Sequence, residues 1–335
     1  MLSLWVKLNN YYSMIKKVTL CILLFLSIFV TESAKAQDPQ FTQFYANPLY
    51  LNPAFAGTAR CPRFCVNYRN EWPGFNKTYI TTSVSYDQHI DALSGGIGLL
   101  VMQDRAGNGT LITTDASFMY SYQLNINREF SLKFGLQGTY HQKTLDWTKL
   151  TFGDMIDRRR GFVYNTNENP NNYPNQTVRA ADVSAGILGY SKRYFVGVAV
   201  NHLTQPSEGF IAVNNSPLPM KLTVHAGANI PLEKGGETYI SPNILYQYQG
   251  QFQQLNLGLY FVKKNIVAGL WYRNQDAMIA LIGFQTDKFK FGYSYDVTIS
   301  KLANVSAGSH EISAQFQLAC RPKHRKFRTI SCPSF

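Results

Sequence analysis

Residues 129–142 read EFSLKFGLQGTYHQ, and apolar and polar side chains alternate along this stretch. In an extended strand successive side chains point to opposite faces, so the alternation separates two faces. One face would be mainly aromatic and aliphatic: Phe130, Leu132, Phe134, Leu136, Gly138 and Tyr140. The other would be mainly polar: Ser131, Lys133, Gln137, Thr139 and His141. A register shift of one residue would exchange the faces, so the pattern specifies which face meets an apolar environment.

Segments of the same kind, about ten residues long and separated by turn residues, follow one another from residue 60 onward. They predict about fourteen strands, over residues 61–70, 78–87, 94–104, 110–124, 129–142, 179–190, 193–203, 219–230, 237–248, 251–261, 265–273, 276–286, 288–297 and 308–319. The connections expected on one side are short, whereas those on the other include residues 143–178, 204–218 and 298–307. This combination is typical of barrels that cross an outer membrane. We therefore expect an all-β fold, a transmembrane antiparallel β-barrel of about 14 strands over residues 61–319.

The composition supports the barrel. Only 16% of the 335 residues are charged, and the chain contains 21 Tyr and 22 Phe. Aromatic residues suit the pleated, half-buried surface of a strand. The strands of a soluble sandwich or propeller also alternate between apolar and polar residues. Such a protein, however, exposes many charged side chains to water, and this chain has few charged residues. The composition therefore favours a sheet whose outer face meets lipid.

Residues 1–36 have the organisation of an export signal. Lys16 and Lys17 precede an apolar run over residues 18–30, and Ala34, Lys35 and Ala36 form a small-residue cleavage site. The apolar run is shorter than the roughly 20 residues that cross a bilayer as a helix. We expect the mature protein to begin near Gln37 and to lie in the cell outer membrane.

Most of the formal net charge of +12 comes from the two ends of the chain. The C-terminal tail, residues 320–335, has no carboxylate and carries five cations: Arg321, Lys323, Arg325, Lys326 and Arg328. We expect this tail in the periplasm, where it binds an anionic partner surface or envelope polymer, or else is a solvated end. A nucleic-acid partner is not expected, because an exported chain meets phosphate mainly as lipid or envelope polymer.

Residues 37–60 form an N-terminal segment that lacks strand alternation. Its expected plug residues are aromatic: Phe41, Phe44, Tyr45, Tyr50 and Phe55. So many apolar groups cannot stay exposed without a risk of aggregation. Asn47-Pro48 and Asn52-Pro53 impose turns, because proline fixes its own φ and restricts the residue before it. We expect a compact plug across or into the periplasmic mouth of the barrel, or alternatively a handle for a periplasmic partner.

We expect no catalytic, cofactor or metal site. The histidines lie on separate segments, and no pair of cysteines has zinc-ligand spacing. Cys61 and Cys65 on one strand would lie about 13 Å apart, too far for a disulfide, and a Cys61–Cys320 bridge is possible but disfavoured by the alternation. Gly95, Gly96 and Gly98 are interpreted as sites of bending.

The basic run Arg158, Arg159 and Arg160 lies in the longest expected outer loop. It is either a solvated loop or a contact surface for a partner.

The opening of the mature chain resembles that of the PorP/SprF family. Residues 38–44, DPQFTQF, and 47–57, NPLYLNPAFAG, carry the resemblance. Further matching segments are Arg69-Asn70 with Trp72 and Gly74-Phe75, residues 96–104, residues 293–296 and residues 308–311. The resemblance thus extends over nearly the whole mature chain, although the cysteine pair and the Arg158–Arg160 run match no family motif.

The resemblance implies an outer-membrane barrel of the type IX secretion and gliding machinery of Bacteroidetes. Its partners would be outer-membrane lipid and periplasmic secretion components, a secreted surface adhesin, or both. The family has no known catalytic centre, so no active-site residue is carried over. We therefore expect a non-enzymatic protein that docks periplasmic machinery or a surface cargo protein. The alternative is a passive transporter or porin for small or hydrophobic solutes.

Overall fold

The computed structural model describes residues 37–74, 78–167, 176–210, 216–233, 237–300 and 303–319. The chain divides after Gln37 into two compact units, and the fold below is that of the second, residues 38–335. No helix among the described residues is long and apolar enough to cross a membrane.

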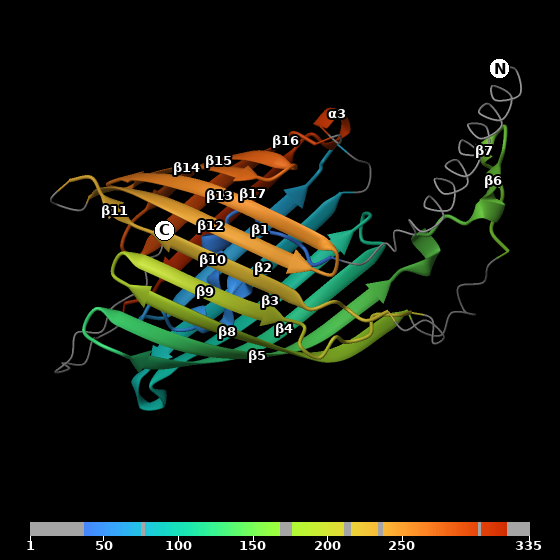
Figure 1. The fold of residues 1–335 in the computed structure, drawn as a ribbon. Coiled ribbons are helices and arrows are strands. Elements are labelled where there is room, and N and C mark those ends of the chain that lie inside the picture. Colours follow the sequence, from blue (N-terminus) through green and yellow to red (C-terminus); the bar gives the residue numbers. More distant parts are fainter. Residues whose placement is uncertain are drawn as a thin grey trace, which may run out of the picture. The chain divides into compact units, whose positions relative to one another are not determined.

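The described strands form a closed antiparallel β-barrel (Figure 1). Apart from the two-residue β11 (Ile230–Pro231), the wall has fourteen strands. They are β1 (Arg63–Glu71), β2 (Tyr79–Ile90), β3 (Gly95–Ala106), β4 (Leu111–Asn125), β5 (Phe130–Leu145), β8 (Thr177–Ser191), β9 (Tyr194–Asn201), β10 (Lys221–Ala228), β12 (Thr238–Gln249), β13 (Phe252–Lys263), β14 (Ile266–Arg273), β15 (Ala277–Gln285), β16 (Phe289–Thr298) and β17 (Ser309–Gln317). Consecutive wall strands are neighbours, and β1 pairs with β17 to close the ring. The predicted fold class is confirmed, and each predicted strand corresponds to one wall strand.

The two faces of the wall have the inverse polarity of a soluble protein. On β5, Lys133 and Ser131 are buried on the inner face, whereas Phe134 and Leu136 are 40% and 62% exposed on the outer face. The outer face of the other wall strands is likewise rich in exposed Leu, Val, Ile, Phe and Tyr. Such a band is stable only in contact with lipid, so the alternation in the sequence is the physical signature of this membrane barrel.

The connections at the two ends of the barrel differ in length. At one end, here the turn end, adjacent strands are joined by short turns such as residues 192–193 and 264–265. At the other, here the loop end, residues 146–176, 202–220 and 299–308 form the longest connections. The first of these carries a small hairpin, β6 (Ile156–Asp157) with β7 (Gly161–Phe162). In barrels of this class the long loops face the cell exterior.

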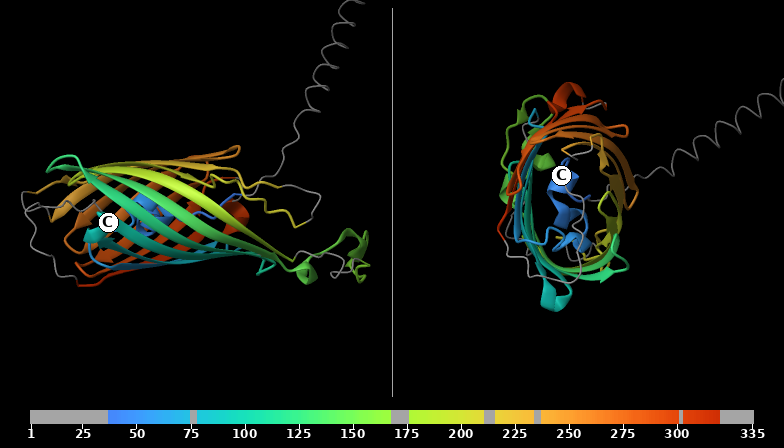
Figure 2. Two further views of the ribbon diagram at one scale, coloured as in Figure 1. Left: turned by 90° about the horizontal axis from the view of Figure 1, so that it is seen from below. Right: turned by 90° about the vertical axis from the view of Figure 1, so that its left-hand side faces the viewer.

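The part of the second unit that precedes β1, residues 38–58, lies inside the barrel (Figure 2). Residues 38–58, here the lumen segment, contain the short helices η1 (Phe44–Ala46), α2 (Pro48–Leu51) and η2 (Pro53–Phe55). Asp38 contacts Lys221 at the loop end, and Gly57 contacts Asp87 near the turn end. The segment therefore runs along the length of the lumen and is not confined to the periplasmic mouth where the sequence led us to expect it. The reason is that the polar partners of Asp38 lie on the far rim.

A charge on the outer face of β5 should cost far more than one on its inner face. We expect Phe134→Arg to lower the free energy of unfolding in lipid vesicles by about 2–4 kcal/mol if the residue lies at midplane depth. Gln137→Arg, on the inner face, should cost little. Urea titration of the folded barrel measures both, and equal losses would refute the register.

Candidate functional site

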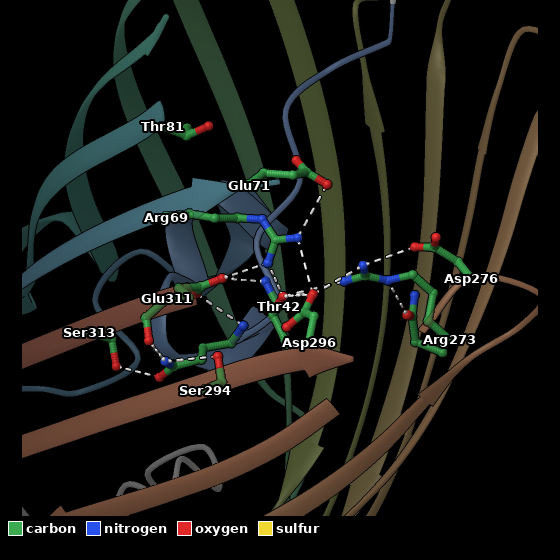
Figure 3. Close-up of polar contacts among 12 residues, drawn as sticks. Thr42, Arg69, Glu71, Thr81, Arg273, Asp276, Ser294, Asp296, Glu311 and Ser313 are labelled. Carbon is green, nitrogen blue, oxygen red and sulfur yellow. Dashed lines mark hydrogen bonds and ion pairs between the residues drawn. The ribbon is translucent and has the colours of Figure 1, made fainter. Parts of the chain in front are cut away.

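A buried polar cluster fixes the start of the lumen segment to the wall (Figure 3). This anchor cluster consists of Thr42 and Gln43 together with Arg69 on β1, Arg273 on β14, Asp296 on β16 and Glu311 on β17. The Glu311 carboxylate accepts hydrogen bonds from two backbone N–H groups, that of Thr42 at 2.5 Å and that of Gln43 at 3.1 Å. Charge-assisted bonds of this kind are stronger than neutral ones. A backbone turn of the lumen segment is thus held by one wall carboxylate.

Two arginines balance the carboxylates of the anchor cluster. Arg69 lies 3.1 Å from Asp296 and 3.4 Å from Glu311, and Arg273 lies 3.2 Å from Asp296. The Thr42 hydroxyl donates to Asp296 at 2.7 Å. All four charged side chains are at most 3% exposed. Buried charges persist only when paired and hydrogen-bonded, so the loss of one member would leave another uncompensated.

The Gln43 side chain completes the attachment. Its amide donates to the Glu311 backbone carbonyl at 3.0 Å, and its oxygen accepts from the Ser313 hydroxyl at 2.6 Å. A Cβ at Gly292 would come closer than 3 Å to this oxygen. Gln43 therefore occupies space that the wall leaves open for it.

A second cluster holds Asp38 at the loop end. Its carboxylate lies 2.9 Å from His202 and 3.3 Å from Lys221, and it accepts from the Gln249 amide at 3.0 Å. Burial alone would raise the pKa of Asp38, but Lys221 and His202 hold it well below its usual range. Burial likewise opposes charge on His202, yet Asp38 and Asp182 raise its pKa to about 10. His202 therefore bridges two carboxylates as a cation, and neither ring nitrogen is left to act as a general base.

Glycines in the wall admit the second half of the lumen segment. A Cβ at Gly135 would come closer than 3 Å to the backbone of Pro53 and Ala54, and one at Gly96 would collide with the backbone of Ala56. The Ala56 carbonyl accepts from the Ser121 hydroxyl at 2.6 Å. Gly96 therefore permits close approach of the lumen segment, a role different from the bending that its place in a strand suggested.

The aromatic residues of the segment pack against the inner wall. Phe44 meets Trp271 at a ring-centroid distance of 5.2 Å, and Tyr45 meets Phe195 at 5.3 Å. Phe55 stacks on His225 at 5.3 Å, and Phe41 packs on Tyr50 within the segment. Of the five aromatic residues named from the sequence, four are buried and Tyr50 is partly buried. All five thus lie inside the barrel.

The other predicted site residues lie elsewhere. Arg158, Arg159 and Arg160 occupy the exposed turn of the β6–β7 hairpin, where Asp157 accepts the backbone N–H groups of the last two. The tail residues Arg321, Lys323, Arg325, Lys326 and Arg328 lie outside the described residues. Cys61 is disulfide-bonded, and Cys65 is a free, buried cysteine. The alternation of the strands disfavoured a Cys61–Cys320 bridge in particular, and Cys320 lies outside the described residues.

Sequence reasoning did not identify the wall residues of the anchor cluster as a site. Arg69, Asp296 and Glu311 do lie in segments that carry the family resemblance. The sequence feature that could have identified them is a charged residue at an inward-facing position near the end of a predicted strand. Within the described residues, no group of three or more His, Cys, Asp or Glu side chains is arranged to hold a metal ion.

One family model matches most of the chain, and several solved structures are similar to it. Residues 33–316 match the family model described as type IX secretion system membrane protein PorP/SprF. None of the curated proteins compared with the chain matches it. Among solved structures, the toluene transporter TbuX of Ralstonia pickettii is similar at 10% identity and a TM-score of 0.46, over 87% of this chain and 98% of that one. The toluene transporter TodX of P. putida is similar at 10% identity and a TM-score of 0.45, over 81% and 93%.

A matched pair of glycine substitutions on β5 tests the fit of the lumen segment. Gly135→Val would push side-chain atoms into the backbone of Pro53 and Ala54, and we expect a loss of about 1–3 kcal/mol from overpacking together with higher ion conductance in planar bilayers. Gly138→Val is the control, because a Cβ there meets nothing within 4 Å. Equal behaviour of the two variants would contradict the packing described for the segment.

Proposed function

The chain belongs to the PorP/SprF family of type IX secretion system membrane proteins, and as an outer-membrane component of that machinery we propose that it is a non-enzymatic docking protein. The observation that carries the proposal is the attachment of the lumen segment to the wall through the anchor cluster. A passive transporter needs a continuous path through its lumen. Here the chain's own N-terminal segment occupies that path and is fixed along its length, which favours docking over the transport of solutes.

The β6–β7 hairpin is the surface we assign to a secreted partner. It lies in the longest described connection and combines Arg158–Arg160 with apolar side chains that no part of the described chain covers: Phe162 is 65% exposed and Tyr164 is 55% exposed. Exposed aromatics beside arginines are the residue types enriched in protein interfaces. A surface protein that presents carboxylates and an apolar patch would fit this hairpin.

The basic tail is the surface we assign to periplasmic partners. The last described strand, β17, ends at the turn end, and residues 321–335, which come after it in the sequence, include no Asp or Glu. Their charge suits an acidic protein surface or an anionic envelope polymer. The protein would thus meet machinery on one side of the membrane and cargo on the other.

Deletion of residues 38–58, with the export signal retained, distinguishes two roles of the lumen segment: a plug that closes the barrel, or a binding site for a periplasmic partner. If the lumen segment closes the barrel, the deletion should raise ion conductance through purified protein in planar bilayers while the barrel still folds. Recovery of secretion components after crosslinking in the native membrane is measured in parallel. Unchanged conductance with lost recovery would show instead that the segment is held by a periplasmic partner.

Neutralising the tail tests its docking role. Replacement of Arg321, Lys323, Arg325, Lys326 and Arg328 by Gln should leave a heat-resistant barrel yet weaken partner recovery. In the unaltered protein this recovery should fall as salt rises, because exposed charges are screened over about 10 Å at 0.1 M salt. If secretion and partner recovery equal those of the unaltered protein, the tail has no docking role.

Neutralising the hairpin tests the outer surface. We expect the triple substitution of Arg158, Arg159 and Arg160 by Gln to reduce display of the cargo protein on intact cells without a change in recovery of periplasmic partners. Arg105→Gln is a matched control, since Arg105 is an exposed cation on β3 outside the hairpin. A display defect of the same size in the control would show a general effect of charge.

A further inference from the structure

The rim of the barrel has a step at the loop end, between β8 and β9. β8 has 15 residues and pairs with β5 from Thr177 to Ser191, whereas β9 has only 8 residues. The pairing of β8 with β9 covers Ala185–Tyr190 alone. Among the described strands, the loop-end half of β8 therefore has a partner on one side only.

β9 ends where the chain turns into the lumen. His202, which follows β9, has a φ of 60°, a backbone conformation that interrupts a strand. The next two residues still reach β8. The Leu203 N–H donates to the Val183 carbonyl at 2.9 Å. The Thr204 hydroxyl donates to the Ala181 carbonyl at 3.4 Å, and the described part of the connection forms no hydrogen bond with β8 nearer to its loop end.

Residues 177–180, here the open edge, continue β8 past these contacts. Successive residues of a paired strand direct their backbone groups to opposite sides, and the carbonyls of Ala181 and Val183 face the connection. The N–H and C=O groups of Thr177 and Arg179 therefore face the same side, away from β5. None of these four groups is hydrogen-bonded to a residue that the structure describes.

The open edge lies beyond the apolar band of the wall. On the outer face of β8, Val183 and Ile187 are 42% and 48% exposed, whereas the outward positions at the open edge are the polar Thr177 and Arg179. Unpaired sheet edges do not occur in the hydrocarbon of a membrane, because their N–H and C=O groups have no partner there. The open edge is therefore in water, at the end where the long loops face the exterior. A secreted protein can reach it there.

The Arg179 side chain determines which strand the open edge accepts. Arg179 is exposed, its Nε donates to Gln142 at 3.4 Å, and it forms no ion pair with any residue in the described ranges. A cation on a strand favours a carboxylate on the neighbouring strand and disfavours a second cation. Pairing of two copies of the open edge would bring their Arg179 side chains close together. The charge thus favours a strand of a different protein.

We propose that the open edge binds an extended segment of a secreted protein, which adds to β8 as a further strand and places a carboxylate beside Arg179. In strand addition, backbone hydrogen bonds provide affinity and side chains provide selectivity. The inference rests on the proposed docking function and specifies how the partner's backbone is held. The β6–β7 hairpin contributes side chains and is a separate surface.

Hydrogen exchange of the β8 amides tests the open edge in the unaltered protein. In the purified barrel in nanodiscs, the N–H groups of Thr177 and Arg179 should exchange on the order of 100-fold faster than those of Val178 and Ala180, which face β5. In the assembly purified from native membranes with its secreted partner bound, the two fast amides should slow by a similar factor. Slowing that appears without the partner and grows with barrel concentration would show pairing of two copies and overturn the proposal.

A pair of substitutions at one position separates the backbone contact from the charge. Arg179→Pro removes an N–H that faces the open side and leaves the bonds to β5 in place, whereas Arg179→Gln removes the same charge and keeps the N–H. We expect display of the partner on intact cells to fall on the order of 10-fold with Arg179→Pro, through the lost bond and the bulk of the ring. With Arg179→Gln it should fall about 2-fold, as for an exposed ion pair.

Three results would overturn strand addition: equal exchange of the four amides in the purified barrel, no slowing when the partner is bound, or equal display with Arg179→Pro and Arg179→Gln. The exchange measurement needs no variant to fold. Deletion of the whole protein provides the separate test of docking. If display persists without the protein, the docking function itself is wrong, whereas a display that requires the protein but leaves the open edge unprotected refutes strand addition alone.

Discussion

The carboxylate of Glu311 is held between the backbone amides of Thr42 and Gln43 on one side and the guanidinium of Arg69 on the other. This contact joins two parts of the chain that are 269 residues apart. Without the lumen segment the carboxylate would lose two donors, and without Glu311 the buried arginine would lose a counter-ion. The barrel wall and the lumen segment therefore stabilise each other. The docking function proposed for the protein depends on this attachment of the segment to the wall.

The barrel accommodates its own N-terminal segment because the side chains on its inner face differ in size from place to place. Glycines at positions 96 and 135 bring the backbone of the segment against the wall, while Trp271 and Phe195 fill the space where the segment carries aromatic rings. A barrel of this size built to conduct would keep its inner side chains solvated. Here polar inner side chains such as Ser121 are hydrogen-bonded to the segment instead.

The wall was predictable from the sequence because strand alternation is a local property. Each predicted strand needed only the residues within it, and even the strand at 276–286, apolar on both faces in sequence, is observed as β15. The path of the lumen segment was not predictable in this way. Its direction depends on pairs such as Asp38 with Lys221, which are 183 residues apart and have no local signal. Its aromatic residues indicated burial, whereas Arg69, Asp296 and Glu311 were not identified as a site, although they lie in segments that carry the family resemblance.

Hydrogen exchange of the backbone amides of Thr42, Gln43 and Gly57 in the membrane-embedded protein tests the central claim most directly. These three N–H groups donate to wall carboxylates at 2.5, 3.1 and 2.8 Å. If the segment is a fixed part of the barrel, they should exchange as slowly as amides of the wall strands, because exchange then requires opening of the folded structure. Exchange at the rate of an unfolded peptide would show that the segment leaves the lumen and would contradict the account.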